Sequence, residues 1–333
     1  MNLLPSFLKP AARSLSLLSC LFVLAACQGP SQAVRPPGAS KTFFSAIAGR
    51  ELSHEESTFE GTGGLQLFSQ SWRPVGEEPR AALIVVHGLR DHSSRYAELA
   101  EHLVGQGCAV YAFDLRGHGH SEGVRVHIDS FDEYLTDVGI LLERVRKQEP
   151  GRPVFLFGHS MGGAIATLFT LEKKPDIAGM VLSAPALKPG ADVSRALIAT
   201  TKVIGGVLPN LKVLELDPKQ FSRDPAVVKE NETDPLIFQQ GGPARTASRL
   251  LGALNTLSER MEEVSTPLLV MHGTGDTVTD PEGSKALAKR ASSKDKTLKL
   301  YDGLYHDLLH EPEKAHVLGD VTQWLKERGS AAH

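Results

Sequence analysis

Apolar and polar positions alternate along this chain as a regular succession of strand-like and helix-like segments, beginning near residue 57. Short apolar runs bounded by turn residues predict strands at Ser57–Glu60, Gln66–Trp72, Ala82–Val86, Ala109–Asp114, Val154–Gly158, Gly179–Ser183, Leu268–His272 and Thr297–Tyr301. Apolar positions at helical spacing predict helices at Ser94–Gly105, Phe131–Lys147, Ser160–Leu171 and a last segment ending at Lys326. Strands that alternate with helices indicate an α/β fold, with a mostly parallel eight-stranded sheet covered by helices on both faces.

The alternation stops at Pro185 and resumes only after about Thr266. This stretch is too long for a simple loop, and it has helical patterning of its own. We therefore expect a helical cap, at about residues 185–266, inserted after the sixth predicted strand. Residues 42–328 then form one folded domain that includes the cap.

The first 26 residues have the pattern of an export signal. Lys9 and Arg13 precede the apolar run Leu15–Leu24, which is too short to cross a bilayer as a stable helix. The run ends in Leu24-Ala25-Ala26-Cys27, which resembles a bacterial lipobox, so Cys27 is expected to carry the lipid. The alternative is a plain secretory signal in which the cysteine is incidental.

Residues 27–41 are rich in Pro, Gly and Ser and predict a flexible tether between the lipid and the folded domain. Two or more acyl chains would hold the protein stably on a membrane. Gln28 follows the cysteine, and its resemblance to Gram-negative lipoproteins favours sorting to the outer membrane. We therefore expect a lipid-anchored protein of the bacterial cell envelope, in the outer membrane.

Charge and cysteine content exclude two classes of protein. The 333 residues carry a net charge of −3 without a block of like charge, which argues against a nucleic-acid partner. The three cysteines, Cys20, Cys27 and Cys108, are too few for a disulfide scaffold. Cys108 lies in an apolar run and is expected to be a buried, inert thiol.

The candidate nucleophile is Ser160, in the sequence Gly158-His159-Ser160-Met161-Gly162. This G-x-S-x-G motif lies between a predicted buried strand and a predicted helix, which is the setting of the nucleophile elbow of the α/β-hydrolase fold. The turn is sharp and brings backbones close together, so glycines are needed on both sides of the serine. The sequence therefore predicts a serine hydrolase.

A serine hydroxyl needs a base, and the base needs an acid that orients it. In this fold the chain order is serine, acid, histidine, with the acid after a late strand and the histidine after the last one. These positions are occupied by Asp276 and His306. The rivals are Asp280, better suited to cap the helix that begins at Pro281, and His310, which falls in a predicted helix.

Two backbone N–H groups are expected to form the oxyanion hole. One belongs to Met161, the residue after the nucleophile, and the other to Leu89, in the loop after the third predicted strand. His118, His120 and His127 lack the spacing and the companion ligands of a metal site, so no metal and no organic cofactor is expected.

The chain resembles the monoacylglycerol lipases and related lysophospholipases from about Phe59 to Trp324. The residues that carry the resemblance are His87-Gly88, Asp91-His92-Ser93, Arg95-Tyr96, Gly117-His118-Gly119, Ser121-Glu122-Gly123, Pro153–Ala166, Val207-Leu208-Pro209-Asn210, Ser222-Arg223, Asp234-Pro235-Leu236, Lys296-Thr297-Leu298-Lys299 and Tyr305-His306. The resemblance implies a glycerol-ester substrate, acyl chains under a hydrophobic cap, and an alcohol site near Asp91 and Arg95. Two positions depart from the family pattern. Leu89 replaces a smaller residue, and Asn231 replaces an aromatic residue near the alcohol pocket.

These observations predict a lipid-anchored serine ester hydrolase that cleaves monoacylglycerols. The alternatives are a lysophospholipase or broad carboxylesterase with the same machinery, and a catalytically silent envelope protein that binds lipid. The cap also leaves two alternatives open, since its apolar segment can pack onto the core or can form an acyl tunnel mouth that touches lipid. That segment comprises Leu197, Ile204, Val207, Leu208, Leu211, Val213 and Leu214.

Overall fold

The computed structural model describes residues 40–47, 49–188, 203–214 and 216–329. The predicted signal, Cys27, nearly all of the predicted tether and Leu197 of the cap lie outside the described residues. None of the described helices has the length and apolarity to cross a bilayer.

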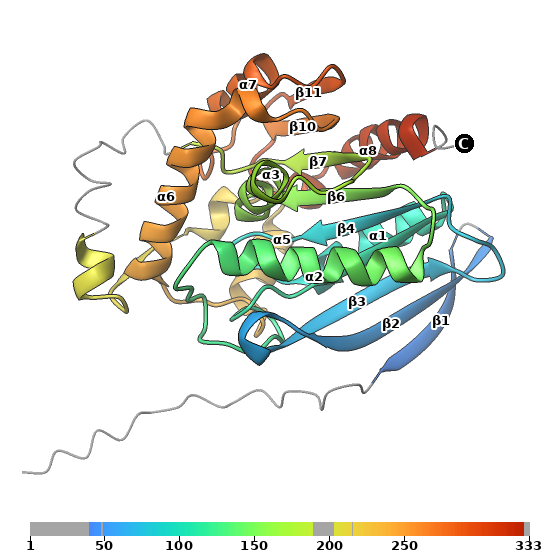
Figure 1. Ribbon diagram of the computed structural model, residues 1–333, viewed down its shortest axis with the longest axis horizontal. Helices are drawn as coiled ribbons and strands as arrows, with labels where there is room; N and C mark the ends of the chain where they lie inside the picture. Colours follow the sequence, from blue (N-terminus) through green and yellow to red (C-terminus); the bar gives the residue numbers. More distant parts are fainter. Residues whose placement is uncertain (1–39, 48, 189–202, 215, 330–333) are drawn as a thin grey trace, which may run out of the picture. The chain divides into compact units, whose positions relative to one another are not determined.

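A nine-stranded sheet forms the centre of the described domain (Figure 1). Its strands are β1 (Lys41–Ile47), β2 (Arg50–Glu60), β3 (Gln66–Pro74), β4 (Ala81–Val86), β5 (Cys108–Phe113), β6 (Val154–His159), β7 (Gly179–Ser183), β10 (Leu268–Gly273) and β11 (Lys296–Tyr301). Their order across the sheet is β1-β2-β3-β5-β4-β6-β7-β10-β11. β1, β2 and β3 pair antiparallel with their neighbours, and all pairs from β5 to β11 are parallel. The predicted α/β fold and all eight predicted strands are confirmed.

The predicted number of strands was wrong by one, because β1 was not recognised. This strand begins at the last residue of the predicted tether and pairs with β2 at the edge of the sheet. Its side chains are almost all exposed, including Phe43 and Phe44. An edge strand held by backbone hydrogen bonds needs no buried face, so it leaves no alternation of apolar and polar residues in the sequence.

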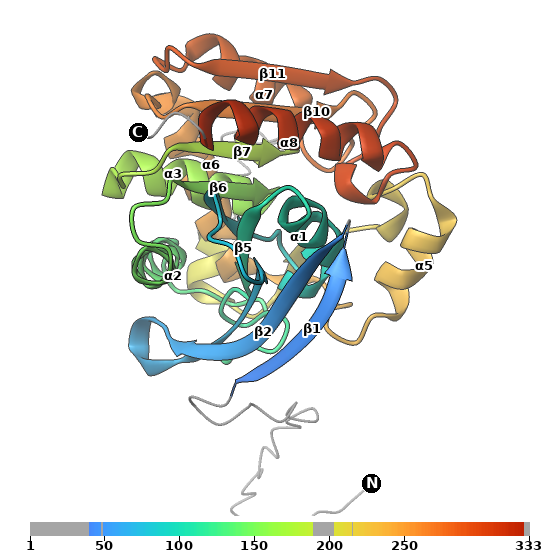
Figure 2. The ribbon, with the colours of Figure 1, turned by 90° about the vertical axis from the view of Figure 1, so that its right-hand side faces the viewer.

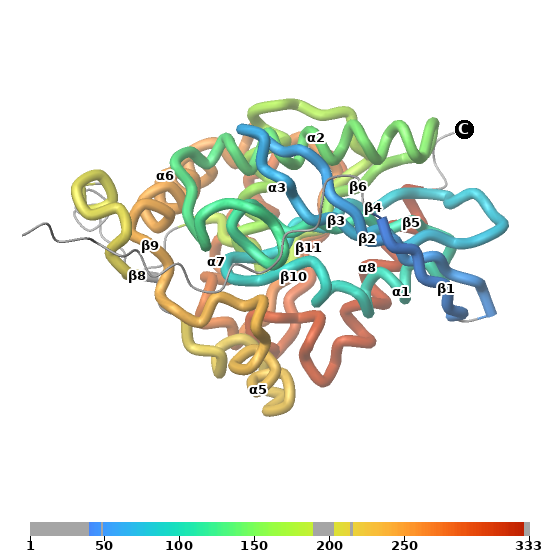
Figure 3. Tube along the Cα trace, turned by 90° about the horizontal axis from the view of Figure 1, so that it is seen from below, coloured from blue at the N-terminus to red at the C-terminus, as the bar shows by residue number. Residues whose placement is uncertain are grey.

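Helices cover both faces of the sheet, and an apolar cluster fills each interface. α2 (Asp132–Gln148) and α3 (Met161–Lys173) lie on one face, and α1 (Ala97–Val104) and α8 (Lys314–Gly329) lie together on the other (Figures 2 and 3). The central strands β4, β5, β6, β7 and β10 are buried along their whole length, as expected for strands covered twice. Cys108 is a free, buried thiol, as predicted.

The segment predicted as a cap connects β7 to β10. Its described elements are β8 (Lys212–Leu214), α5 (Pro225–Thr233), β9 (Gly242–Pro243) and α6 (Ala244–Arg260). β8 and β9 form a small antiparallel sheet, although helices alone were predicted for the cap. In Figure 1 the arrowheads of β4, β6 and β7 point toward the side on which α6 lies, so the cap elements lie beyond the carboxyl ends of the strands.

Part of the cap presents apolar side chains to solvent. Five of them are between 42% and 74% exposed: Val203, Val207, Leu208, Leu211 and Val213. Val207, Leu208, Leu211 and Val213 also belong to the predicted apolar segment. For these four residues, the alternative that the segment packs onto the core was wrong. A cluster of exposed apolar side chains of this kind is typical of a surface that contacts lipid or another protein.

Candidate active site

Ser160 occupies the turn between β6 and α3. β6 ends at His159 and α3 begins at Met161, so a single residue separates the strand from the helix. The backbone of Ser160 has φ 53° and ψ −120°, a conformation that is strained for a residue with a Cβ atom. Its N–H donates to the Ser183 carbonyl oxygen at 3.0 Å, and its own carbonyl oxygen accepts from the Ala186 N–H at 3.0 Å. The neighbouring strand β7 therefore holds the strained residue in place.

The two flanking glycines are required by close backbone contacts. A Cβ atom on Gly162 would lie 2.0 Å from the carbonyl oxygen of Val86, at the end of β4. A Cβ atom on Gly158 would lie 2.5 Å from the carbonyl oxygen of Gly162. Both distances are far inside van der Waals contact, so the strand, the turn and the helix can come together only if these positions lack side chains.

Asp276 and His306 are brought together from the loops after β10 and β11. The Nδ1–H of His306 donates to Oδ2 of Asp276 at 2.8 Å, and both side chains are fully buried. The other carboxylate oxygen, Oδ1, accepts from the backbone N–H groups of Val278 and Thr279. The rival Asp280 instead caps α7 (Pro281–Arg290), where it accepts from the Glu282 N–H at 2.9 Å.

Two further side chains support Asp276, and sequence reasoning missed both. Nε2 of His272 lies 3.0 Å from Oδ2 of Asp276, and the Thr279 hydroxyl donates to the same oxygen at 2.8 Å. Burial alone would raise the pKa of Asp276. Electrostatic attraction to His306 and the hydrogen bonds from His272 and His306 more than offset this effect of burial. They hold the pKa of Asp276 well below its usual range. Asp276 is therefore an anion near neutral pH.

The second ring nitrogen of His306, Nε2, is not used by the contact with Asp276. Nε2 is buried and has no hydrogen-bond partner among the described residues. The imidazole lies 4.8 Å, centroid to centroid, from the ring of His159, the residue before Ser160, and 5.3 Å from Phe221 of the cap. Burial and the charge of His306 lower the pKa of His159 to about 4, so His159 is neutral near pH 7. Nε2 of His306 is the ring nitrogen left open for contact with a substrate.

The rival His310 is engaged elsewhere. Its Nδ1 lies 2.8 Å from Asp307 and its Nε2 lies 3.1 Å from the Arg95 carbonyl oxygen. Both ring nitrogens are occupied, and neither contacts Asp276 or Ser160.

The two predicted oxyanion donors, Leu89 and Met161, are buried next to the elbow. Neither N–H donates to another residue in the described part of the chain. His87 holds the start of the Leu89 loop, since its Nδ1–H donates to the Gly88 carbonyl oxygen at 2.7 Å and its Nε2 accepts from the Leu115 N–H at 2.9 Å. Only a neutral imidazole makes both bonds, and burial lowers the pKa of His87 accordingly.

The three tentative substrate residues, Asp91, Arg95 and Asn231, line one narrow pocket between the Leu89 loop and the cap. The volume of this pocket is about 30 Å³. The remaining lining residues are Leu89, Arg90, Leu216, Pro218, Phe221, Ile237 and Gln239. The structure therefore brings together residues that are 140 positions apart in the sequence.

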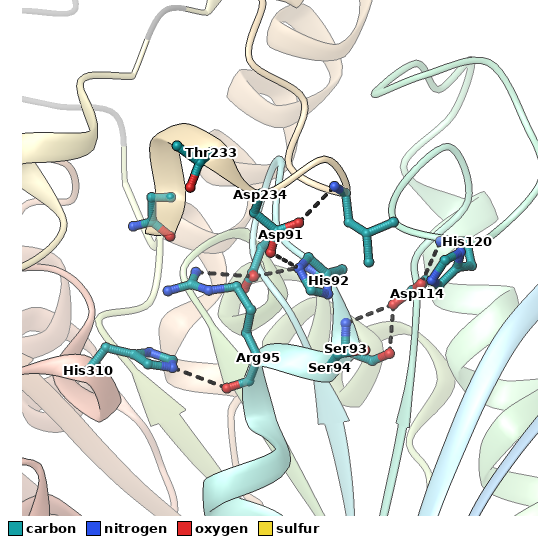
Figure 4. A network of polar contacts seen from close by, with 12 residues as sticks. Asp91, His92, Ser93, Ser94, Arg95, Asp114, His120, Thr233, Asp234 and His310 are labelled. Carbon is teal, nitrogen blue, oxygen red and sulfur yellow. Dashed lines mark hydrogen bonds and ion pairs between the residues drawn. The ribbon is translucent and has the colours of Figure 1, made fainter. Parts of the chain in front are cut away.

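The polar atoms of Asp91 and Arg95 are largely occupied by contacts within the protein (Figure 4). Asp91 accepts from the His92 N–H, the Tyr96 hydroxyl and Arg95. Arg95 also donates to Asp307 at 2.7 Å. By contrast, Oδ1 of Asn231 is buried without a hydrogen-bond partner among the described residues, so this side chain can still bind a ligand.

The histidines after β5 belong to a structural turn. Asp114 accepts from the Ser93 N–H and hydroxyl and from the His120 N–H, each at 2.7 Å. Nδ1 of His118 lies 2.9 Å from the Arg116 carbonyl oxygen. Among the described residues no group of His, Cys, Asp and Glu has the arrangement of a metal site.

Comparison with known proteins places these features in a family. The family described as "Serine aminopeptidase, S33" matches residues 77–313. The monoacylglycerol lipase of Mycolicibacterium smegmatis is 37% identical over 273 residues, which cover 82% of this chain and 97% of that protein. The human monoglyceride lipase is 38% identical, and the aligned residues cover 81% of this chain and 89% of that protein. The crystal structure of Paleococcus ferrophilus monoacylglycerol lipase has a TM-score of 0.71 and 33% identity, over 79% of this chain and 99% of that one.

The order of strands, the helical layers and the family match define a serine hydrolase with the α/β-hydrolase fold. The relatives align over about four-fifths of the chain and nearly their own whole length. The chain belongs to the monoacylglycerol lipase family of α/β-hydrolases.

Proposed function

We propose that the protein hydrolyses monoacylglycerols to fatty acid and glycerol through an acyl-enzyme formed on Ser160. The observation that carries this proposal is the buried Asp276–His306 pair: Nε2 of His306 has no partner among the described residues, and its ring lies 4.8 Å, centroid to centroid, from the ring of His159, the residue before Ser160. The similarity to proteins named monoacylglycerol lipase supports the choice of substrate.

The proposed cycle uses side chains, backbone N–H groups and water. Nε2 of His306 takes the proton of Ser160 as Oγ attacks the ester carbonyl, and Asp276 stabilises the charged imidazole. The N–H groups of Leu89 and Met161 stabilise the tetrahedral oxyanion. His306 then gives its proton to the departing glycerol oxygen, and a water molecule repeats the sequence on the acyl-enzyme to release the fatty acid.

The substrate class is testable with a panel of esters. We expect kcat/KM for a long-chain monoacylglycerol to exceed that for the matching lysophosphatidylcholine at least tenfold, which is about 1.4 kcal/mol of transition-state binding. The physical reason is the narrow pocket, which offers Asn231 to a small hydroxylated group and contains no aromatic cage for a choline. The measurement is fatty-acid release by residues 41–333, with a short-chain nitrophenyl ester as reference.

Each outcome of this panel separates the alternatives. Equal or faster turnover of the choline lipid would identify a lysophospholipase, and fast turnover of the nitrophenyl ester alone would identify a broad carboxylesterase. If no ester is cleaved and folded protein does not react with a fluorophosphonate probe, the protein is a silent lipid-binding member of the fold.

We propose further that Cys27 is acylated and that the protein is anchored in the bacterial cell envelope, in the outer membrane. Support comes from Leu24-Ala25-Ala26-Cys27 and from Gln28 in the sequence. The exposed apolar side chains of the cap, among them Val207 and Leu208, support contact with the lipid surface that supplies the substrate.

The anchor predicts a specific labelling result. In a Gram-negative host grown with an alkyne fatty acid, the wild-type chain should become labelled and should remain with the membrane fraction. The Cys27→Ala variant should lose the label and move to the soluble fraction or retain its uncleaved signal, whereas Cys108→Ala should behave like wild type. A soluble, unlabelled wild-type protein would instead indicate a plain secretory signal.

A further inference from the structure

The loop that carries Leu89 is bonded directly to one loop of the cap. Nε–H of Arg90 donates to the carbonyl oxygen of Phe238 at 2.5 Å. Nε2 of His92 lies 2.9 Å from Oδ2 of Asp234 (Figure 4). Residues 234–238 of the cap are therefore held at both ends by residues within three positions of Leu89.

Arg90 has a backbone conformation that needs such support. Its φ is 63°, in the left-handed region, which is unfavourable for a residue with a Cβ atom and open to glycine. One peptide unit joins Leu89 to Arg90, so the φ of Arg90 fixes how that unit, with the Leu89 carbonyl group, is oriented and thereby constrains the backbone of Leu89. A relaxed Arg90 would shift this peptide unit, and the backbone of Leu89 that carries the donor N–H would shift with it.

The guanidinium of Arg90 has no acidic partner to explain its burial. The side chain is 8% exposed, and no carboxylate among the described residues forms an ion pair with it. Burial lowers the pKa of Arg90, and no neighbouring charge offsets this effect. A second arginine, Arg125, donates to the Leu236 carbonyl oxygen in the same cap loop at 3.0 Å. The cap loop thus supplies the acceptors for two arginines of the core.

We propose that Arg90 and His92 are positioning residues through which the cap loop 234–238 holds Leu89 in its oxyanion-donating conformation. The inference rests on the proposed function, since an oxyanion hole serves acyl transfer only. The pocket between the two loops is narrow, about 30 Å³, and Leu89 and Arg90 both line it.

A matched pair of variants tests whether the strained backbone of Arg90 depends on its bond to the cap. Arg90→Ala removes the bond to the cap and keeps the Cβ atom, so the loop relaxes. We expect kcat to fall about 10²-fold, the effect of losing one oxyanion donor, with KM changed less than threefold. Arg90→Gly removes the same bond but accepts φ 63° without strain, so its kcat should fall less than tenfold. The affinity for an alkyl boronic acid, which forms a tetrahedral adduct on the serine, should fall in parallel with kcat.

A second pair tests the other end of the loop. His92→Phe keeps a ring but loses the N–H, and kcat should fall about tenfold. His92→Gln keeps a donor for Asp234 and should retain more activity than His92→Phe. Glu232→Ala, an exposed residue of α5 in the same cap, is the matched control and should keep wild-type kcat. The His92 variants also test the proposal if Arg90→Ala lowers the Tm too far for its activity to be assayed.

The proposal is overturned if Arg90→Ala and His92→Phe keep wild-type kcat, if their defect appears in KM alone, or if Arg90→Ala and Arg90→Gly lose activity equally. These results would leave hydrolysis by the wild-type protein intact. Failure of the proposed function itself would appear differently, as absence of ester turnover by the wild type.

Discussion

The Ser160→Ala variant is expected to lose monoacylglycerol hydrolysis, with kcat lowered roughly 10⁶-fold. The hydroxyl is the group proposed to form the acyl-enzyme, and no other side chain occupies the elbow between β6 and α3. The assay is release of fatty acid from a monoacylglycerol, with labelling by a fluorophosphonate probe as an independent measurement. The variant should bind the boronic acid only weakly, because the tetrahedral adduct needs the Ser160 oxygen.

Ser183→Ala is the matched control for this experiment. Ser183 lies at the end of the adjacent strand β7, and its hydroxyl is buried without a hydrogen-bond partner among the described residues. Its contact with Ser160 is made by the backbone carbonyl, which alanine retains. Ser183→Ala should therefore still react with the probe. Persistent labelling of Ser160→Ala would show that another residue is the nucleophile.

The Asp276→Asn variant should lower kcat about 10⁴-fold while KM changes little. The carboxylate accepts the Nδ1–H of His306, and in the proposed cycle this leaves Nε2 as the ring nitrogen that serves as the base. An amide at this position can donate to Nδ1 and stabilise the wrong tautomer. The measurement is steady-state kinetics on the same monoacylglycerol, together with the Tm to show that the variant folds.

Asp280→Asn separates the two candidate acids. Asp280 is the N-cap of α7, and asparagine caps a helix about as well as aspartate. We expect kcat within about twofold of wild type and at most a small drop in Tm from the lost pair with Lys188. If Asp280→Asn were the variant that lost activity and Asp276→Asn did not, the assignment of the acid would be reversed.

Much of the fold could be predicted from local patterns. The run Val154–Gly158 and the strand β6 differ by one residue, because a strand buried on both faces must be apolar throughout and must end at turn residues. β1 and the small β8–β9 sheet were missed for the opposite reason. Their strands gain their stability from backbone pairing, which imposes little on side chains.

The positions of the candidate triad were also predictable. The carboxyl ends of parallel strands meet at one edge of the sheet, so residues that directly follow β6, β10 and β11 approach one another. The supporting side chains could not be placed in this way. His272 lies inside an apolar strand, where its polar ring signalled an unseen partner, but nothing in the sequence indicated that the partner was Asp276.

The sequence by itself determined the order of strands and helices, the elbow around Ser160 and the loops that hold Asp276 and His306. These features depend on the periodicity and turn chemistry of neighbouring residues, which are local properties. Only the tertiary structure decided that Asn231 lines the pocket and that Arg90 bonds to a carbonyl oxygen 148 residues away. Such contacts arise where two irregular loops pack together, and irregular loops carry no periodic pattern from which their partners can be predicted.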